Sequence, residues 1–159
     1  MSCTSTIVWF RRDLRIHDNP ALTEATERGS VVPVFIWSDE DDGPTSPGSA
    51  SRWWLHHSLA NLDHELRNRG LRLIIRRGLP TDVLRALIDE TGAEAVFWNR
   101  LYEPSACEQE IAVERTFPSR SFNGSLLREP WDVETRTGGP YKVFTPYWKA
   151  SERLAEPSR

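Results

Sequence analysis

The strongest constraint on the fold is a repeated alternation of short apolar runs with segments of helical spacing. The runs are rich in Val, Ile and aromatic residues and nearly continuous, as strands covered on both faces are. They are Thr6–Phe10, Val31–Trp37, Leu71–Ile75 and Ala95–Trp98, with a weaker fifth at Ser119–Phe122. Strands that alternate with helices through short connections predict an α/β fold, in which a parallel sheet carries helices on both faces.

The predicted helices have clear start and stop signals. An Asp or Asn cap followed by Pro at the first helical position opens a helix at Pro20, which ends near Gly29. A leucine stripe at helical spacing marks a second helix from about Ser51 to Arg69, with Gly70 as its stop. Two more helices are expected, at 80–91 and 104–115.

Composition places the chain among ordinary globular proteins. Its 159 residues carry 20 basic and 23 acidic side chains, a net charge of −3. This mild acidity argues that the segment alone is not a strong nucleic-acid binder, because such binding draws on a basic surface. Two cysteines form no disulfide framework and no metal-ligand spacing. With neither a signal peptide nor a membrane-length apolar run, we expect a cytoplasmic protein with no membrane contact.

The carboxyl-terminal part differs from the rest of the chain. Residues 1–130 read as the α/β domain, whereas residues 131–159 read as an irregular tail whose aromatic side chains have neither helix nor strand spacing. Such side chains need a surface to pack against, so we expect a domain cut from a longer protein. A long loop, acidic and then rich in Pro, Gly and Ser, is expected at Ser38–Ala50.

Ligands of open parallel sheets bind outside the carboxyl ends of the strands, where the strand order reverses. The loop after the first strand there holds Arg11, Arg12, Asp13 and Arg15. Arginines in this position can clamp an anionic ligand through their rigid fork of donors. The alternative is an internal network of ion pairs that stiffens the loop, and most charged loops are of this kind.

Two further segments face the same edge of the sheet. After the fourth strand, Asn99 and Glu103 bring an amide and a carboxylate; Glu103 either accepts hydrogen bonds from a ligand or supports the start of the following helix. At the start of the second helix, one of Trp53 and Trp54 is expected to face the core. The other, with Trp37, can stack on a planar ligand or simply pack.

Several chemical signatures are absent from the sequence. It contains no glycine-rich phosphate loop, no hydrolase nucleophile elbow and no set of metal ligands. We therefore predict no metal site in this segment.

The motifs together resemble the amino-terminal part of the DNA photolyase/cryptochrome family. The resemblance covers nearly all of residues 6–149, and its blocks follow the family's order. These blocks are Ile7–Arg15, Asp18–Leu22, Ser51–Leu55, Phe97–Arg100, Tyr102–Pro104, Ser121–Asn123 and Tyr141–Trp148.

The resemblance implies a Rossmann-like, five-stranded sheet of order 3-2-1-4-5 that holds a light-harvesting antenna pigment. In the family a linker then leads to a helical domain, which holds FAD and binds damaged DNA. Light-driven electron transfer from the reduced flavin splits cyclobutane pyrimidine dimers. The expected function is thus the antenna domain of a deoxyribodipyrimidine photolyase, with a cryptochrome-type photoreceptor as the alternative. The resemblance implies that this segment contains no catalytic residue and is inactive by itself.

The resemblance also implies a pigment site. Family members that bind a deazaflavin share residues matching Arg12, Arg52 and Glu103, but carry an aspartate where this chain has Leu101. Members with the bacterial folate pattern have an Asn-Glu pair in place of Ser105-Ala106. The chain is similar to the plant-cryptochrome-like branch, for which methenyltetrahydrofolate is favoured over a deazaflavin. The expected contact residues are Arg12, Trp37, Arg52, Trp53, Asn99 and Glu103.

Overall fold

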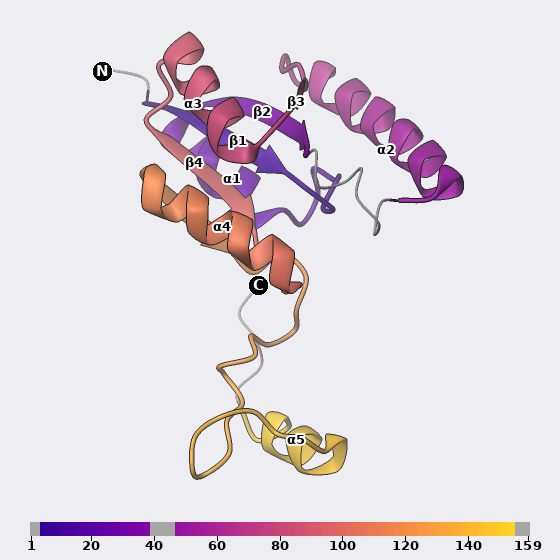
Figure 1. Cartoon of the computed structure of the whole chain (residues 1–159), viewed down its shortest axis with the longest axis vertical. Helices are drawn as coiled ribbons and strands as arrows, with labels where there is room; N and C mark the ends of the chain where they lie inside the picture. Colours follow the sequence, from indigo (N-terminus) through magenta and orange to yellow (C-terminus); the bar gives the residue numbers. More distant parts are fainter. Residues whose placement is uncertain (1–3, 39–46, 155–159) are drawn as a thin grey trace. The chain divides into compact units, whose positions relative to one another are not determined.

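A computed structural model describes residues 4–38 and 47–154 (Figure 1). The chain divides into two compact units, residues 1–124 and 125–159, which are described separately below. The expected domain boundary at residue 130 falls inside the second unit. Most of the long loop expected at Ser38–Ala50, and the last residues of the expected tail, lie outside the described residues.

The first unit is a five-stranded parallel sheet of order β3-β2-β1-β4-β5, which confirms the predicted fold class. Its central strand β1 pairs with β2 on one side, where Trp9 lies opposite Val34, and with β4 on the other, where Ile7 lies opposite Val96. The strands are β1 (Thr4–Phe10), β2 (Gly29–Trp37), β3 (Ile74–Arg77), β4 (Ala95–Asn99) and β5 (Ser119–Phe122). The helices of this unit are α1 (Pro20–Arg28), α2 (Ser49–Arg67), α3 (Pro80–Thr91) and α4 (Pro104–Thr116).

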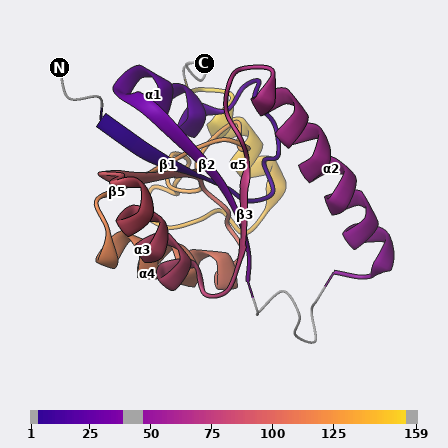
Figure 2. The ribbon, with the colours of Figure 1, turned by 90° about the horizontal axis from the view of Figure 1, so that it is seen from above.

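Side chains of β1 alternate between two apolar cores, one on each face of the sheet. Val8 and Phe10 pack with α1 and α2, whereas Ile7 and Trp9 pack with α3 and α4. Figure 2 shows the two pairs of helices on opposite sides of the strands. Burial on both faces explains why this strand has no polar alternation in the sequence.

Strand β3 begins three residues later than the sequence pattern predicts. The backbone N–H of Leu71 donates to the carbonyl of Leu66, which closes the end of α2. The N–H of Leu73 donates to a carboxylate oxygen of Asp63, 3.0 Å away. These bonds hold residues 71–73 against α2, so pairing with β2 starts only at Ile74.

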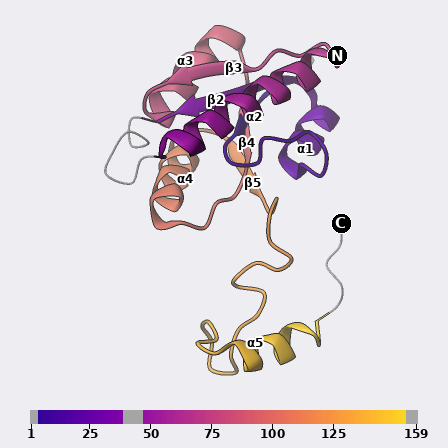
Figure 3. The same ribbon diagram turned by 90° about the vertical axis from the view of Figure 1, so that its right-hand side faces the viewer.

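The second unit contains a helix, α5 (Phe144–Ser151), where we expected only irregular chain (Figure 3). Pro146 lies in its first turn, where a backbone N–H has no partner within the helix and proline is therefore tolerated. Phe144 and Trp148 stack one turn apart with ring centroids separated by 6.1 Å. The absence of a capping side chain removed the usual start signal from the sequence.

No helix in the described part of the chain is both long and apolar enough to cross a membrane.

Candidate functional site

A cleft of about 660 Å³ opens at the carboxyl ends of β1, β2 and β4. The strand order reverses between β1 and β4, so the cleft occupies the position at which open parallel sheets bind ligands. Its lining residues come from the ends of β1 and β2 and from α2 and α4. They include Trp9, Arg12, Trp37 and Trp54.

Arg11 forms a buried ion pair beside this cleft. Its guanidinium donates to Glu110 of α4 and, at 3.3 Å, to Gln109, and it lies 4.5 Å from the ring centroid of Trp9. Both side chains of the Arg11–Glu110 pair are more than nine-tenths buried. Burial lowers the pKa of Arg11, and the negative charge of Glu110 opposes this shift. The pair joins the end of β1 to α4, so it stiffens the cleft.

Asn99 belongs to a second buried network. Its side-chain amide donates to Asp13 at 2.6 Å and to Asn19 at 2.8 Å, while its oxygen accepts the backbone N–H of Ala21. Asn19 in turn caps α1 by accepting the N–H of Leu22. The Asn99 amide therefore fixes the start of α1 against the end of β4.

The loop after β1 thus uses its charges mainly within the protein, as the ion-pair alternative predicts. Arg12, which lines the cleft, also pairs with Glu103, but this pair is not buried: the two side chains are 70% and 48% exposed. Glu103 occupies the position before α4 but makes no capping hydrogen bond with its side chain. Arg12 is therefore a charged side chain of this loop that a ligand in the cleft can reach.

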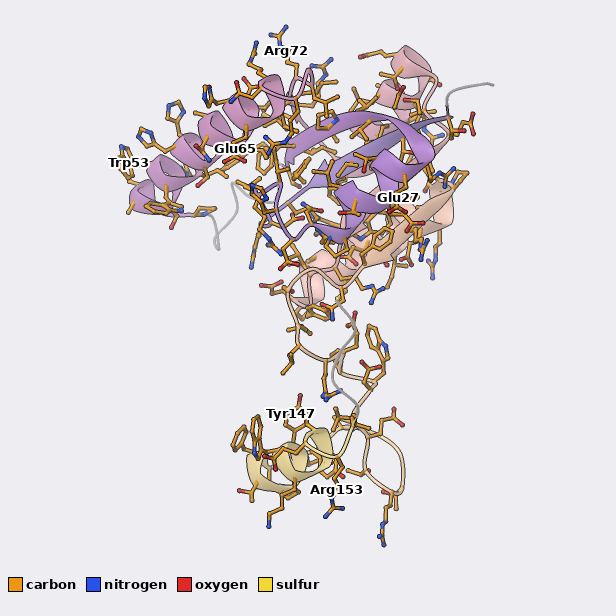
Figure 4. All side chains as sticks on the ribbon, turned by 180° about the vertical axis from the view of Figure 1, so that it is seen from behind. Glu27, Trp53, Glu65, Arg72, Tyr147 and Arg153 are labelled. Atoms are coloured by element: carbon orange, nitrogen blue, oxygen red, sulfur yellow. The ribbon has the colours of Figure 1, made fainter. Side chains whose placement is uncertain are left out.

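The expectation that one tryptophan at the start of α2 faces the core is wrong. Trp53 is 61% exposed and Trp54 is 69% exposed, because the leucine stripe occupies the inner face and is fully buried only at Leu62 and Leu66. Trp54 lines the cleft, whereas Trp53 packs edge-on against His57. Figure 4 shows Trp53 near the amino-terminal end of α2.

The structure therefore brings together only some of the expected site residues. Arg12 and Trp37 line the cleft, and Glu103 pairs with Arg12. Arg52 donates to the carbonyl of Pro47, a lining residue, at 2.8 Å, and Asn99 is buried in its own network.

Sequence reasoning missed several lining residues. The most informative are Ser51 and Ser58 of α2, which share one helix face with Trp54 and Leu55. Their spacing of three and four residues was a readable signal, because positions so spaced lie on one side of a helix. Across α4, Gln109 contributes an amide that also accepts from Arg11.

The cleft has the chemistry of a binding site for a planar molecule with polar edges. Two indoles and Leu55 supply apolar walls, and Arg12 and Ser105 supply donors. Its volume lies within the range of roughly 300–1,000 Å³ that is typical of ligand pockets. Within residues 4–38 and 47–154 no three His, Cys, Asp or Glu side chains gather in a way that holds a metal ion.

Comparison with known proteins agrees with the fold. The family model described as DNA photolyase matches residues 6–159. The chain belongs to the DNA photolyase family. This photolyase-family chain is 46% identical over 157 residues to the deoxyribodipyrimidine photo-lyase of Agrobacterium fabrum, a match covering 95% of the chain and 32% of that protein. It is also 46% identical to cryptochrome-2 of Arabidopsis thaliana, with 91% of the chain and 24% of that protein covered.

Among solved structures, a bacterial class III photolyase from Agrobacterium tumefaciens superimposes with a TM-score of 0.87 at 44% identity. The match covers 99% of this photolyase-family chain and 33% of that structure. The chain thus spans about a third of the length of its photolyase relatives and corresponds to their amino-terminal α/β domain.

Proposed function

We propose that the chain is the antenna domain of a deoxyribodipyrimidine photolyase. In this proposal the cleft at the ends of β1, β2 and β4 holds the light-harvesting pigment. The rest of the polypeptide supplies a helical domain that binds FAD and damaged DNA. The observation that carries the proposal is the coincidence of this cleft, walled by Trp37 and Trp54, with the strand-reversal point of a photolyase-family sheet.

The side chains of the cleft fit a pigment such as methenyltetrahydrofolate. When bound, such a pigment absorbs light and passes the excitation energy to the flavin. Trp37 and Trp54 offer faces for a flat ring system, and Arg12 offers charged donors at its edge. We infer that these residues hold the pigment in one orientation, and that the Arg11–Glu110 pair keeps the wall behind them rigid.

A pigment titration tests the site. We expect methenyltetrahydrofolate to bind the purified chain with a change in its absorption spectrum, and a deazaflavin to bind more weakly. Replacing Trp54 with Ala should weaken binding about two- to tenfold, since a stacking contact contributes roughly 0.5–1.5 kcal/mol beyond area burial.

The matched control is Trp53→Ala, which removes a similarly exposed indole from the preceding position of the same helix. This variant should bind as the unchanged chain does, because Trp53 does not line the cleft. Equal losses in both variants would place the pigment elsewhere, and failure of both pigments to bind would refute an antenna role.

A cryptochrome-type photoreceptor is the second candidate. It is favoured by the 46% identity to Arabidopsis cryptochrome-2, which equals the identity to the photolyase relative. The two functions separate in an assay on the full-length polypeptide with reduced FAD and DNA that contains cyclobutane dimers. Repair under blue light supports the photolyase, whereas intact dimers with the flavin bound support the photoreceptor.

A further inference from the structure

Helix α2 is buried only towards its carboxyl-terminal end. Residues 49–61, called here the amino-terminal segment of α2, contain no buried side chain, and the first buried residues of the helix are Leu62 and Leu66. The other helices of the first unit are buried from their first turn, at Ala21 in α1, Pro80 in α3 and Ala106 in α4. Figures 1 and 2 show the amino-terminal end of α2 directed away from the strands.

The carboxyl-terminal end of α2 is held by polar and apolar contacts. The carbonyl of Leu66 accepts the N–H of Leu71 at 3.0 Å, and a carboxylate oxygen of Asp63 accepts the N–H of Leu73 at 3.0 Å. The side chains of Leu62 and Leu66 belong to the apolar core that α2 shares with α1 and the sheet. This end of the helix is therefore fixed to the first unit.

The amino-terminal segment is held less firmly. Gly48, the residue before it, has no side chain that could cap the first N–H groups of the helix. Leu55 and Leu59 pack against the apolar core but are only partly buried. The hydroxyl of Ser58 donates to the carbonyl of Trp54 at 2.9 Å, a contact that slightly destabilises and bends helices. Helices shorter than about 12–15 residues are marginal in water without such packing.

This segment forms one wall of the first cleft. The lining residues that α2 contributes are Ser51, Trp54, Leu55 and Ser58. All of them precede Leu62, the first buried residue of the helix. The wall formed by β1 and α4 is fixed instead by the buried Arg11–Glu110 pair. The cleft thus has one firm wall and one wall on a weakly held helix segment.

We propose that the amino-terminal segment of α2 is a mobile wall that folds onto the ligand of the first cleft. In the ligand-free chain the segment opens locally, because its unfolding exposes little buried apolar surface. A planar ligand against Trp54 and Leu55 supplies the apolar surface that the segment lacks, so binding favours the helical form. Opening admits the ligand, and closure holds it in one orientation. The proposal rests on the proposed function, in which that ligand is the antenna pigment.

Amide hydrogen exchange, followed residue by residue by NMR, tests this mobility. In the ligand-free chain the N–H groups of residues 53–61 should exchange about tenfold faster than those of residues 62–67 in the same helix. Saturation with methenyltetrahydrofolate should slow the exchange of residues 53–61 about tenfold. The N–H groups of α1, which contributes no lining residue, should exchange as before.

Ala60→Gly tests the coupling to ligand binding without altering the cleft. Ala60 is exposed and does not line the first cleft. Because glycine disfavours the helical form, this variant should bind methenyltetrahydrofolate about two- to fivefold more weakly. The matched control is Ala86→Gly, the same change at an exposed position of α3 outside the cleft. The control should bind the pigment as the unchanged chain does.

The possible results separate the mobile wall from the antenna site. Exchange in the ligand-free chain that is as slow at residues 53–61 as at residues 62–67 overturns the mobile wall, while the antenna site stands. Pigment binding that leaves this exchange unchanged, or that is equally tight in Ala60→Gly, overturns closure on the ligand. Failure of the pigment to bind overturns the antenna site and closure together. Slow exchange of the segment in the ligand-free, full-length polypeptide also overturns the mobile wall, and assigns its cover to the rest of the protein.

Discussion

Glu110→Leu should lower the free energy of unfolding far more than Glu103→Leu. Each substitution removes a carboxylate that pairs with an arginine of the loop after β1. Glu110→Leu replaces a buried carboxylate with an apolar side chain of similar size, and it leaves the guanidinium of Arg11 buried without its counter-charge. Breaking a buried pair in this way costs about 3–5 kcal/mol. The N–H of Leu101, which donates to Glu110 at 2.9 Å, loses its acceptor too.

The matched control is Glu103→Leu, which removes the partner of Arg12. The side chains of that pair are 70% and 48% exposed, so water and salt already weaken their attraction. Exposed pairs contribute about 0–1 kcal/mol. Both substitutions thus replace a glutamate that pairs with an arginine of the loop after β1. They differ in how deeply the ion pair is buried.

Urea denaturation followed by far-ultraviolet circular dichroism measures both free energies of unfolding. We expect the double variant Arg11→Met/Glu110→Leu to recover most of the loss, because it removes the unpaired charge as well. Should Glu110→Leu prove no more destabilising than Glu103→Leu, the assignment of Arg11–Glu110 as a buried, stabilised pair is wrong.

Two further predictions concern the same unit. Gly124→Ala should lower the free energy of unfolding by about 1–3 kcal/mol in thermal or urea denaturation, because a Cβ there would lie 2.6 Å from the side-chain carbon Cγ of Asn99; an unchanged stability would contradict the close contact. The hydrogen bond from Arg67 lowers the pKa of Asp63 in the folded chain. The stability that ionised Asp63 contributes is therefore fully present above its ordinary pKa near 3.9, and it is lost as the pH falls through the lower pKa of the folded state. The stability difference between the unchanged chain and Asp63→Asn should therefore vanish in strong acid, and a difference that grows on acidification would refute the assignment.

Local sequence signals predicted most of the first unit. The apolar runs and the Asn19-Pro20 start signal located α1, β1, β2 and β4, because these elements owe their limits to residues within or next to them. The start of β3 depends instead on the bond from Leu73 to Asp63, ten residues away on another element. A periodicity argument contains no information about such a contact.

The candidate site was predicted in position but not in detail. The strand-end rule selected the loops after β1, β2 and β4, and the cleft lies there. The choice between Trp53 and Trp54 depended on the rotation of α2, which the phase of its leucines sets. Arg11 and Glu110 are separated by 99 residues in the chain, so their pairing follows only from the folded sheet.

The two arginines that follow β1 have different consequences for ligand binding, although they are neighbours in sequence. Arg11 stays with Glu110, because breaking this pair would leave a buried guanidinium without a counter-charge. Arg12 can leave Glu103 at a cost of about 0–1 kcal/mol, because water already competes for both groups. A ligand with an anionic edge can therefore recruit Arg12 from its present partner at little cost, while Arg11 preserves the wall of the cleft. In the proposed antenna function, pigment binding should accordingly respond to substitutions at Arg12 and Glu103, and the free energy of unfolding to substitutions at Arg11 and Glu110.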